Sequence, residues 1–323
     1  MPGTPENKKG PDTPAARQEL SRRDALRILG VGAAALGSAV AHGSEPAKAS
    51  AAPGGTTLMD KVGEYFQDHY QRMTKEEIDA AIGRLERKYK TQLGVDVKVA
   101  DTPPIPGVVF GYALNLNKCK GYRECVKACV AENNQGRDSQ IQYIRVLEID
   151  RDTASLEESD HYYDHEVPAP GKYYMPVQCL QCENPPCVAA CPVKATWKEV
   201  DGIVVIDYNW CIGCRFCLAA CPYWARHFNW TDPVIPKEEI NPVTHYLSNR
   251  PRPRGVMEKC TFCLQRTRKG KMPACQEACP NGARVFGNLL DPESEIRYVL
   301  ENKTVFRLKE ELNTEPKFWY YVD

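Results

Sequence analysis

The residues that could do chemistry in this chain are its cysteines. There are 15 of them among 323 residues, all between Cys119 and Cys279, and most lie two or three positions from the next. An oxidising compartment would normally turn such cysteines into disulfides. The odd count leaves one unpaired, however, and C-x-x-C spacing suits metal ligation better than a disulfide framework. The sequence therefore predicts metal centres.

The cysteines form four groups, and the third is the most specific. It reads Cys211-Ile-Gly-Cys214-Arg-Phe-Cys217-Leu-Ala-Ala-Cys221-Pro222, which matches the bacterial ferredoxin pattern. In that pattern three thiolates hold one [4Fe-4S] cluster, and the fourth, one helical turn further along, ligates another. Gly121 and Gly213 are expected to permit the unusual backbone dihedrals of such loops. C-x-x-C pairs also make structural zinc sites, but those rarely repeat as runs of four close cysteines.

The elements that must position these loops also repeat. Strand-like stretches at 108–114 and 202–207 precede the first and third groups, and each predicted unit is a strand, a cysteine loop and a short helix. Two such units make a ferredoxin-like module. The predicted fold is therefore α+β, with two interleaved bacterial-ferredoxin-like modules, up to four clusters and an N-terminal helical extension. The long gap between the first two groups is expected to carry strands, for example at 141–147.

The N-terminus has the layout of an export signal. Arg22 and Arg23 precede a weakly apolar run that ends at a small-residue cleavage site, which resembles a twin-arginine signal over 1–41. That route exports proteins already folded with their cofactors, so metal-loaded cysteines would escape disulfide formation. A periplasmic location on the cytoplasmic membrane follows as an expectation. No other segment approaches ~18 consecutive apolar residues, so membrane attachment would need a partner.

The remaining boundaries follow from composition and periodicity. Residues 42–57 are expected to form a linker. Residues 58–105 are expected to form two short amphipathic helices, and a capping box of Thr74 and Glu77 begins the second. The helix-breaking segment 102–106 is expected to follow this second helix. The four-cluster domain is predicted over 106–290. A short helix is expected after Pro292, and 291–323 is expected to form terminal strands or a docking tail. The zero net charge argues against a nucleic-acid partner.

Two segments carry the most specific resemblance to a known family. They are Gln178-Cys-Leu-Gln-Cys-Glu-Asn-Pro-Pro-Cys187 and Glu258-Lys-Cys-Thr-Phe-Cys263. From about Gly107 onward, the chain resembles the four-cluster iron–sulfur subunits of molybdopterin-type oxidoreductase complexes, including polysulfide, dimethyl sulfoxide and nitrate reductases, formate dehydrogenase and alternative complex III. It is most similar to exported members that sit beside a polysulfide-reductase-type membrane subunit.

The resemblance implies a ligand set for each cluster, with the first cysteine group paired with the fourth and the second with the third. Cluster 1 would take Cys119, Cys125 and Cys279, and cluster 2 would take Cys129, Cys260, Cys263 and Cys275. Cluster 3 would take Cys179, Cys182, Cys187 and Cys221, and cluster 4 would take Cys191, Cys211, Cys214 and Cys217. The resemblance also implies that cluster 1 faces a large partner subunit and cluster 4 a membrane subunit.

One position departs from the family pattern. Tyr122 stands where the family has the second cysteine of the first group, which leaves cluster 1 with three thiolates. We expect a [3Fe-4S] cluster there beside three [4Fe-4S] clusters. The alternatives are a fourth iron ligated by oxygen or water, and a missing cluster.

The resemblance implies an electron-transfer subunit that is not catalytic alone. It would relay single electrons between an integral membrane quinol or quinone subunit and a large periplasmic partner, either molybdopterin-type or a cofactor-less relative that works with cytochrome c. Three alternatives stay open: the electron-transfer subunit of an exported hydrogenase, a structural zinc-binding scaffold, and a stand-alone soluble ferredoxin.

Three further features have two interpretations each, and a fourth has one. The aromatic residues from Tyr223 to Trp230 could shield a cluster from water or form ordinary core, and the basic residues from Arg266 to Lys271 could offset cluster charge or form a solvated loop. Arg250-Pro-Arg-Pro-Arg254 is expected to be an extended surface segment or a partner contact. His161 and His165 are four residues apart in a polar loop, where a metal site is not expected.

Overall fold

The computed structural model describes residues 73–323, except 154, 157 and 158. The predicted signal, the linker and the first predicted helix lie outside the described residues. In the described part, short helices alternate with small sheets, so the predicted α+β class is confirmed. None of the helices described there combines the length and apolar character that a bilayer-spanning helix needs.

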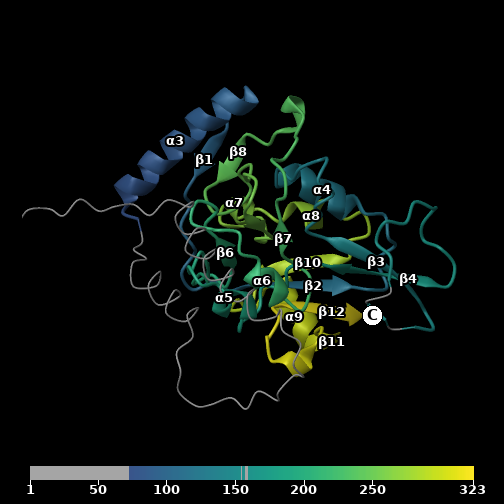
Figure 1. The fold of residues 1–323 in the computed structure, drawn as a ribbon. Coiled ribbons are helices and arrows are strands. Elements are labelled where there is room, and N and C mark those ends of the chain that lie inside the picture. Colours follow the sequence, from purple (N-terminus) through teal and green to yellow (C-terminus); the bar gives the residue numbers. More distant parts are fainter. Residues whose placement is uncertain (1–72, 154, 157–158) are drawn as a thin grey trace, which may run out of the picture. The chain divides into compact units, whose positions relative to one another are not determined.

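Helix α3 (Lys75–Leu93) begins at the predicted capping box. The Thr74 hydroxyl accepts a hydrogen bond from the Glu77 backbone N–H at 3.3 Å, and the Glu77 carboxylate accepts one from the Thr74 N–H at 2.8 Å. Gly94, at φ 68°, ends the helix. The helix therefore ends at Gly94, before it reaches segment 102–106, which the sequence predicts to be the helix breaker. Strand β1 (Lys98–Ala100) lies between them and pairs in parallel with β8 (Val243–His245), as Figure 1 shows.

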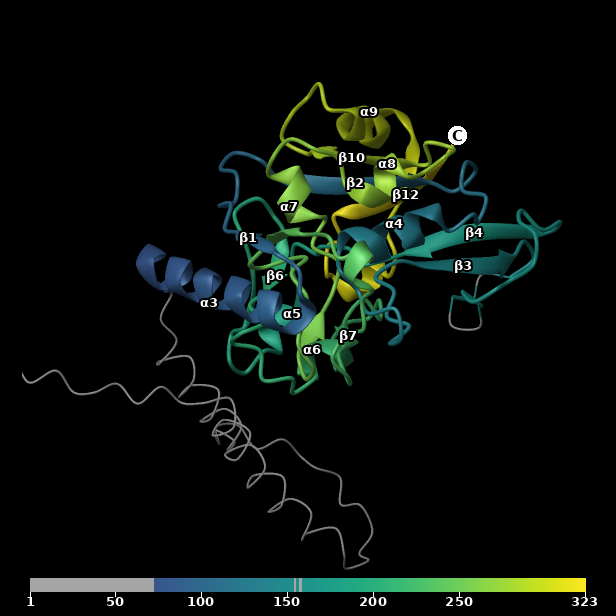
Figure 2. The ribbon, with the colours of Figure 1, turned by 90° about the horizontal axis from the view of Figure 1, so that it is seen from above.

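The largest sheet of the described residues has four strands in the order β10-β2-β12-β11 (Figure 1), and Figure 2 shows β10, β2 and β12 from above. The predicted strand before the first cysteine group is β2 (Phe110–Asn115), which pairs antiparallel with β10 (Arg284–Asn288) and parallel with β12 (Phe318–Val322). Strand β11 (Thr304–Phe306) closes one edge. The predicted helix α9 (Glu295–Asn302) covers one face of the sheet.

The C-terminal segment belongs to this sheet. Phe318 and Tyr320 of β12 are fully buried, and Phe318 stacks on Tyr112 of β2 with ring centroids 5.0 Å apart. Of the two possibilities that the sequence leaves open for 304–323, the strands are therefore correct. A separate tail would expose these aromatic side chains to water, at a cost of about 2 kcal/mol for each of them.

The remaining strands of the described residues form three two-stranded sheets. The gap between the first two cysteine groups carries the hairpin of β3 (Arg145–Asp150) and β4 (Lys172–Val177), and β3 starts four residues later than predicted. Strand β5 (Thr196–Lys198) pairs with the predicted strand β6 (Val204–Ile206), and β7 (His227–Phe228) pairs with β9 (Met257–Glu258). Two 3-10 turns, η1 (Lys237–Glu239) and η2 (Glu310–Leu312), lie in the connections.

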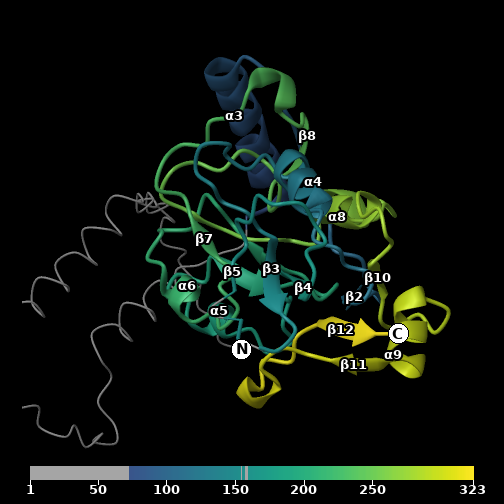
Figure 3. The ribbon, with the colours of Figure 1, turned by 90° about the vertical axis from the view of Figure 1, so that its right-hand side faces the viewer.

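Five helices lie beside the cysteine loops. They are α4 (Glu124–Glu132), α5 (Pro186–Ala189), α6 (Phe216–Ala219), α7 (Leu264–Thr267) and α8 (Ala274–Glu277). Helix α4 of the first group packs on α8 of the fourth, and α5 of the second group packs on α6 of the third (Figure 3). The groups therefore meet in the pairs that the family resemblance implies.

The prediction that segment 250–254 lies at the surface is wrong for Arg250 and Arg252. Arg250 and Arg252 are among the most completely buried large side chains of the described protein. Arg250 lies over the rings of Tyr208 and Tyr246, each 5.1 Å away, and Arg252 forms an ion pair with buried Glu258. The alternation with proline indicates an extended segment, but the partners that bury these arginines come from elsewhere in the chain.

Candidate metal centres

The four cysteine loops share one local conformation. In each loop, the residue before the second ligand position has a positive φ. These residues are Gly121 (80°), Gln181 (48°), Gly213 (73°) and Phe262 (51°). The left-handed turn brings backbone N–H groups toward the sulfur atoms, and the Phe262 N–H lies 3.4 Å from Cys260 Sγ. The predicted need for Gly121 and Gly213 is confirmed, and the first loop keeps the turn although Tyr122 follows it.

Two cavities are lined by the cysteines of the second and third groups. Cys179, Cys182, Cys187 and Cys221 line one of them. Cys191, Cys211, Cys214 and Cys217 line the other. These are the sets implied for clusters 3 and 4. In both cavities one cysteine comes from the opposite group, which is the exchange that a ferredoxin pattern requires.

The first and fourth groups come together in the same way. The pKa of the Cys119 thiol is raised to about 11, mainly by burial, with contributions from the neighbouring Cys125 and Cys279. Burial likewise raises the pKa of Cys129 well above its usual range, with contributions from Cys263, Cys260 and Cys275. The sets implied for clusters 1 and 2 are therefore electrostatic neighbours, although their members lie about 150 residues apart in the sequence.

Thiols of successive sets interact electrostatically. After burial, the largest effect that raises the pKa of Cys260 in the second set, to about 12, comes from Cys179 in the third. Burial raises the pKa of Cys275, and Cys125 of the first set adds to the rise. Burial also raises the pKa of Cys217 in the fourth set to about 12, with a contribution from Cys187 of the third. Adjacent sets interact in the order 1, 2, 3 and 4.

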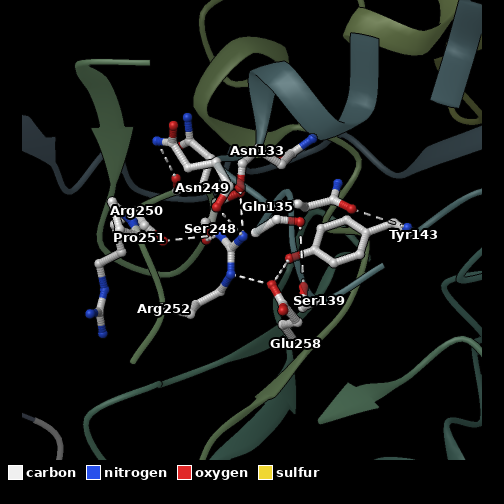
Figure 4. A network of polar contacts seen from close by, with 12 residues as sticks. Asn133, Gln135, Ser139, Tyr143, Ser248, Asn249, Arg250, Pro251, Arg252 and Glu258 are labelled. Carbon is white, nitrogen blue, oxygen red and sulfur yellow. Dashed lines mark hydrogen bonds and ion pairs between the residues drawn. The ribbon is translucent and has the colours of Figure 1, made fainter. Parts of the chain in front are cut away.

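A buried polar network supports the second set (Figure 4). The amides of Asn133 and Gln135 each donate to Cys129 Sγ at 3.4 Å. Arg252 donates to the Asn133 carbonyl at 2.6 Å and forms its ion pair with Glu258, which accepts a hydrogen bond from Tyr143 at 2.5 Å. Hydrogen bonds to cluster sulfurs are one of the main influences on cluster potential.

These sites fit iron–sulfur clusters. Each set consists of thiols, and two buried arginines lie beside the sets: Nη2 of Arg226 donates to Cys187 Sγ, and Nη1 of Arg284 lies 3.9 Å from Cys275 Sγ. Nε and Nη1 of Arg226 and Nη2 of Arg284 are buried without a hydrogen-bond partner. A cluster held by thiolates carries a net negative charge that would match such cations. In the described residues, no three histidine, cysteine or acidic side chains gather closely enough to hold a single metal ion.

The other candidate residues have structural surroundings. His165 pairs with Glu148 at 2.7 Å, and His161 packs against Tyr162. Arg268 pairs with Asp201 and Glu199, and Arg266 with Glu132 and Glu277, so both arginines neutralise carboxylates. Lys269 and Lys271 are exposed, which confirms the solvated-loop interpretation for them.

The aromatic residues after the third group divide between core and surface. Tyr223 is buried, whereas Trp230 is 66% exposed. Phe228 packs beside the loop of the fourth set, where a Cβ on Gly213 would lie 3.0 Å from its ring. The sequence did not single out Arg226 and Arg284 as functional residues. Their common offset, five residues after the last cysteine of a group, is the signal that could have found them.

Comparison with known proteins gives the same class. A family model described as a 4Fe-4S dicluster domain matches residues 171–241 and 242–289. The iron–sulfur cluster-binding subunit of menaquinone reductase from Nitratidesulfovibrio vulgaris is 38% identical, over 66% of this chain and 88% of that protein. A selenate reductase subunit from Mesobacillus selenatarsenatis is 35% identical, over 94% of this chain and 97% of that protein.

A further relative is a polysulfide reductase component from Wolinella succinogenes, 41% identical over 44% of this chain and 63% of that protein. The cysteine sets and these relatives together define an iron–sulfur protein that carries [4Fe-4S] clusters. This protein belongs to the family of iron–sulfur subunits of oxidoreductase complexes. It is an electron-transfer subunit rather than a catalytic one, and the hydrogenase and zinc-scaffold alternatives are not favoured.

Proposed function

We propose that this chain relays single electrons along four clusters in a linear order, with one partner subunit at each end. The interaction of each thiol set with the next, from the first to the fourth, supports this proposal. The ligands are the cysteines of the four sets described above, three for cluster 1 and four for each of the others. The clusters, when bound, accept and release one electron at a time.

The protein's own residues hold the clusters and keep water away from them. Eight of the fifteen cysteines are buried. Because burial raises the thiol pKa values of Cys129 and Cys263 well above their usual range, loading these cysteines with iron must displace protons, so assembly would be favoured at higher pH. The positive-φ loops and the amides of Asn133 and Gln135 supply N–H donors, which stabilise negative charge on sulfur.

Cluster 1 is proposed to be a [3Fe-4S] cluster, with Tyr122 at the position of the missing thiolate. Tyr122 is 43% exposed and lines a surface groove with Arg123, Val126 and Lys127. The side of cluster 1 without a thiolate would therefore face this open groove. Oxygen ligation of a fourth iron is the second candidate, because a phenol and water are both available at this place.

The partners are proposed from the relatives. Names such as menaquinone reductase and polysulfide reductase point to a membrane subunit that reacts with a quinone, next to cluster 4, and a large redox subunit of the molybdopterin type or a relative that works with cytochrome c, next to cluster 1. The arginine pair at 22–23 supports export by the twin-arginine route and a periplasmic location, with membrane attachment through partners.

The architecture proposed for this function is two interleaved ferredoxin-like modules. Packing of α4 on α8 and of α5 on α6 supports one module from the outer pair of cysteine groups and one from the inner pair. The proposed segments are a signal over 1–41, a linker over 42–57, a helical extension over 58–105 and a four-cluster domain over 106–290. Residues 291–323 follow this domain and extend its sheet.

The experiment is electron paramagnetic resonance (EPR) of the oxidised complex, purified without oxygen, with iron and zinc counted on the same sample. The proposal predicts a [3Fe-4S] signal and about fifteen irons per chain. About sixteen irons without that signal would mean a fourth, non-thiolate ligand at cluster 1. Zinc in place of iron would overturn the electron relay altogether.

A further inference from the structure

Arg226 and Arg284 occupy the same place in two different cysteine groups. Each lies five residues after the last cysteine of its group, Cys221 and Cys279 respectively. Their side chains are only 3% and 4% exposed. A buried guanidinium loses its hydration and is costly unless other charges compensate it. The counter-charge for these two side chains therefore has to lie inside the protein.

Arg226 lies between the third and fourth thiol sets. It lines both of their cavities. Its Nη2 donates to Cys187 Sγ of the third set at 2.9 Å and to Thr196 Oγ1 at 3.0 Å. It also interacts electrostatically with Cys217 of the fourth set. Its Nε and Nη1 are buried without a hydrogen-bond partner.

Arg284 has the matching place between the first and second sets. It interacts electrostatically with Cys125 of the first set and Cys275 of the second. Its Nη1 donates to Gln178 at 3.0 Å and lies 3.9 Å from Cys275 Sγ, while Nη2 has no partner. The guanidinium also lies over the Tyr112 ring, 5.6 Å from its centroid.

The other buried arginines differ in their partners. Arg252 pairs with Glu258, and Arg268 with Asp201 and Glu199. Arg250 donates hydrogen bonds to the Tyr246 carbonyl and the Asn209 side-chain oxygen, and it lies over two tyrosine rings. Among the described residues, neither Arg226 nor Arg284 forms an ion pair with a carboxylate. Thiolate sulfur is the anionic partner that the fold presents to both of them.

We propose that Arg226 and Arg284 are charge-coupling residues, each holding a positive charge between the two clusters of one pair. The inference rests on the proposed relay. When one electron enters either cluster of a pair, the added negative charge is stabilised by the fixed cation in a medium of low dielectric constant. The arginine stays protonated, and no bond forms or breaks. Each arginine therefore raises the reduction potentials of two neighbouring clusters.

The test is an EPR-monitored redox titration of the intact complex carrying Arg226→Gln. Two of the four cluster potentials should fall. At a fixed ambient potential the reduced-to-oxidised ratio of those two clusters should drop at least tenfold, which is ~59 mV for a one-electron couple. Arg284→Gln should shift the other two potentials by a similar amount. No assignment of signals is needed, because the two variants must move different pairs.

Two variants serve as controls. Arg226→Lys keeps a cation in the same cavity and should keep the reduced-to-oxidised ratios within about threefold of wild type, since charge rather than shape sets the effect. Arg268→Gln removes an equally buried arginine that is paired with carboxylates. It should lower stability and leave all four potentials unchanged.

The outcomes separate this inference from the relay itself. Unchanged potentials in either iron-loaded Gln variant overturn the coupling role and leave the relay intact. If a Gln variant fails to load iron, Arg226→Lys decides: loaded clusters with near-native potentials support the role of charge, and loss of iron in Lys and Gln variants alike overturns it. Failure of the relay would appear in the wild type, as zinc in place of iron or as missing clusters.

Discussion

In the proposed relay, Tyr122 decides the composition of cluster 1. It follows Gly121 in the same left-handed turn that precedes Cys182, Cys214 and Cys263 in the other loops. The first loop therefore has the backbone turn of the other three loops but a tyrosine at the ligand position. Because a thiolate is what completes a four-iron cluster at this corner, the difference between three and four irons rests on one side chain.

Tyr122→Cys should convert cluster 1 to a [4Fe-4S] cluster. The oxidised [3Fe-4S] EPR signal should disappear, and the iron content should rise by about one per chain. Tyr122→Phe is the matched control, because it removes the hydroxyl without adding a thiol and should leave the signal in place. An unchanged spectrum in the Cys variant would contradict the proposed composition of cluster 1.

The cysteine loops depend on close backbone approach as well as on sulfur. A Cβ added to Gly213 would lie 2.2 Å from the Gly255 carbonyl oxygen, which real structures do not permit. Gly270 has nearly the same backbone angle, with φ 72° against 73°, but a Cβ there meets nothing within 4 Å. These two glycines therefore separate the cost of a strained angle from the cost of a collision.

Gly213→Ala should prevent cluster 4 from binding. This loss should appear as about four fewer irons per chain and as the absence of one redox wave. Gly270→Ala introduces only the strain of a side chain at positive φ, which costs about 1–2 kcal/mol, and this variant should keep its full iron content. Iron analysis and EPR on both variants provide the comparison. Full iron in Gly213→Ala would mean that the loop can move away from Gly255 without releasing its cluster.

The whole described fold is joined by contacts between distant segments, and His245 makes one of them. Its Nε2 donates to the Thr102 carbonyl at 3.0 Å, while Nδ1 accepts from the Leu247 N–H at 3.1 Å, so the folded protein holds the neutral ring. Burial lowers its pKa to about 3. Above pH ~6.5 the His245 ring is neutral in both the folded and the unfolded state. Below pH ~6.5 the ring takes up a proton in the unfolded state first.

Stability should therefore fall as the pH drops from ~6.5 toward ~3, and His245 should account for about 3 kcal/mol of that loss at pH 4.5. His245→Asn should lose correspondingly less stability than wild type between pH 7 and pH 4.5, measured by urea unfolding followed through tryptophan fluorescence. Comparison with wild type cancels the acid sensitivity of the clusters. The same substitution at exposed His165 is the control, and an equal pH effect in both variants would rule out this role for His245.

The amino-acid sequence by itself determined the cofactor class and the local form of the sites. The spacing of Cys211, Cys214, Cys217 and Cys221 predicts the loop and its helix, because neighbouring residues alone build that turn. The strands β2 and β6, the capping box of α3 and the odd ligand position at Tyr122 were likewise readable, since each depends on a short stretch of chain.

Only the tertiary structure decided which charges are buried and what they face. Arg250 and Arg252 lie inside the protein because tyrosine rings and Glu258 come to them from other segments. Arg226 contacts sulfur of the third set and lines the cavity of the fourth, because α5 packs on α6. The same holds for β12, whose place beside β2 brings together residues about 200 positions apart. Local spacing encodes a loop, whereas burial and charge pairing depend on contacts that no local pattern contains.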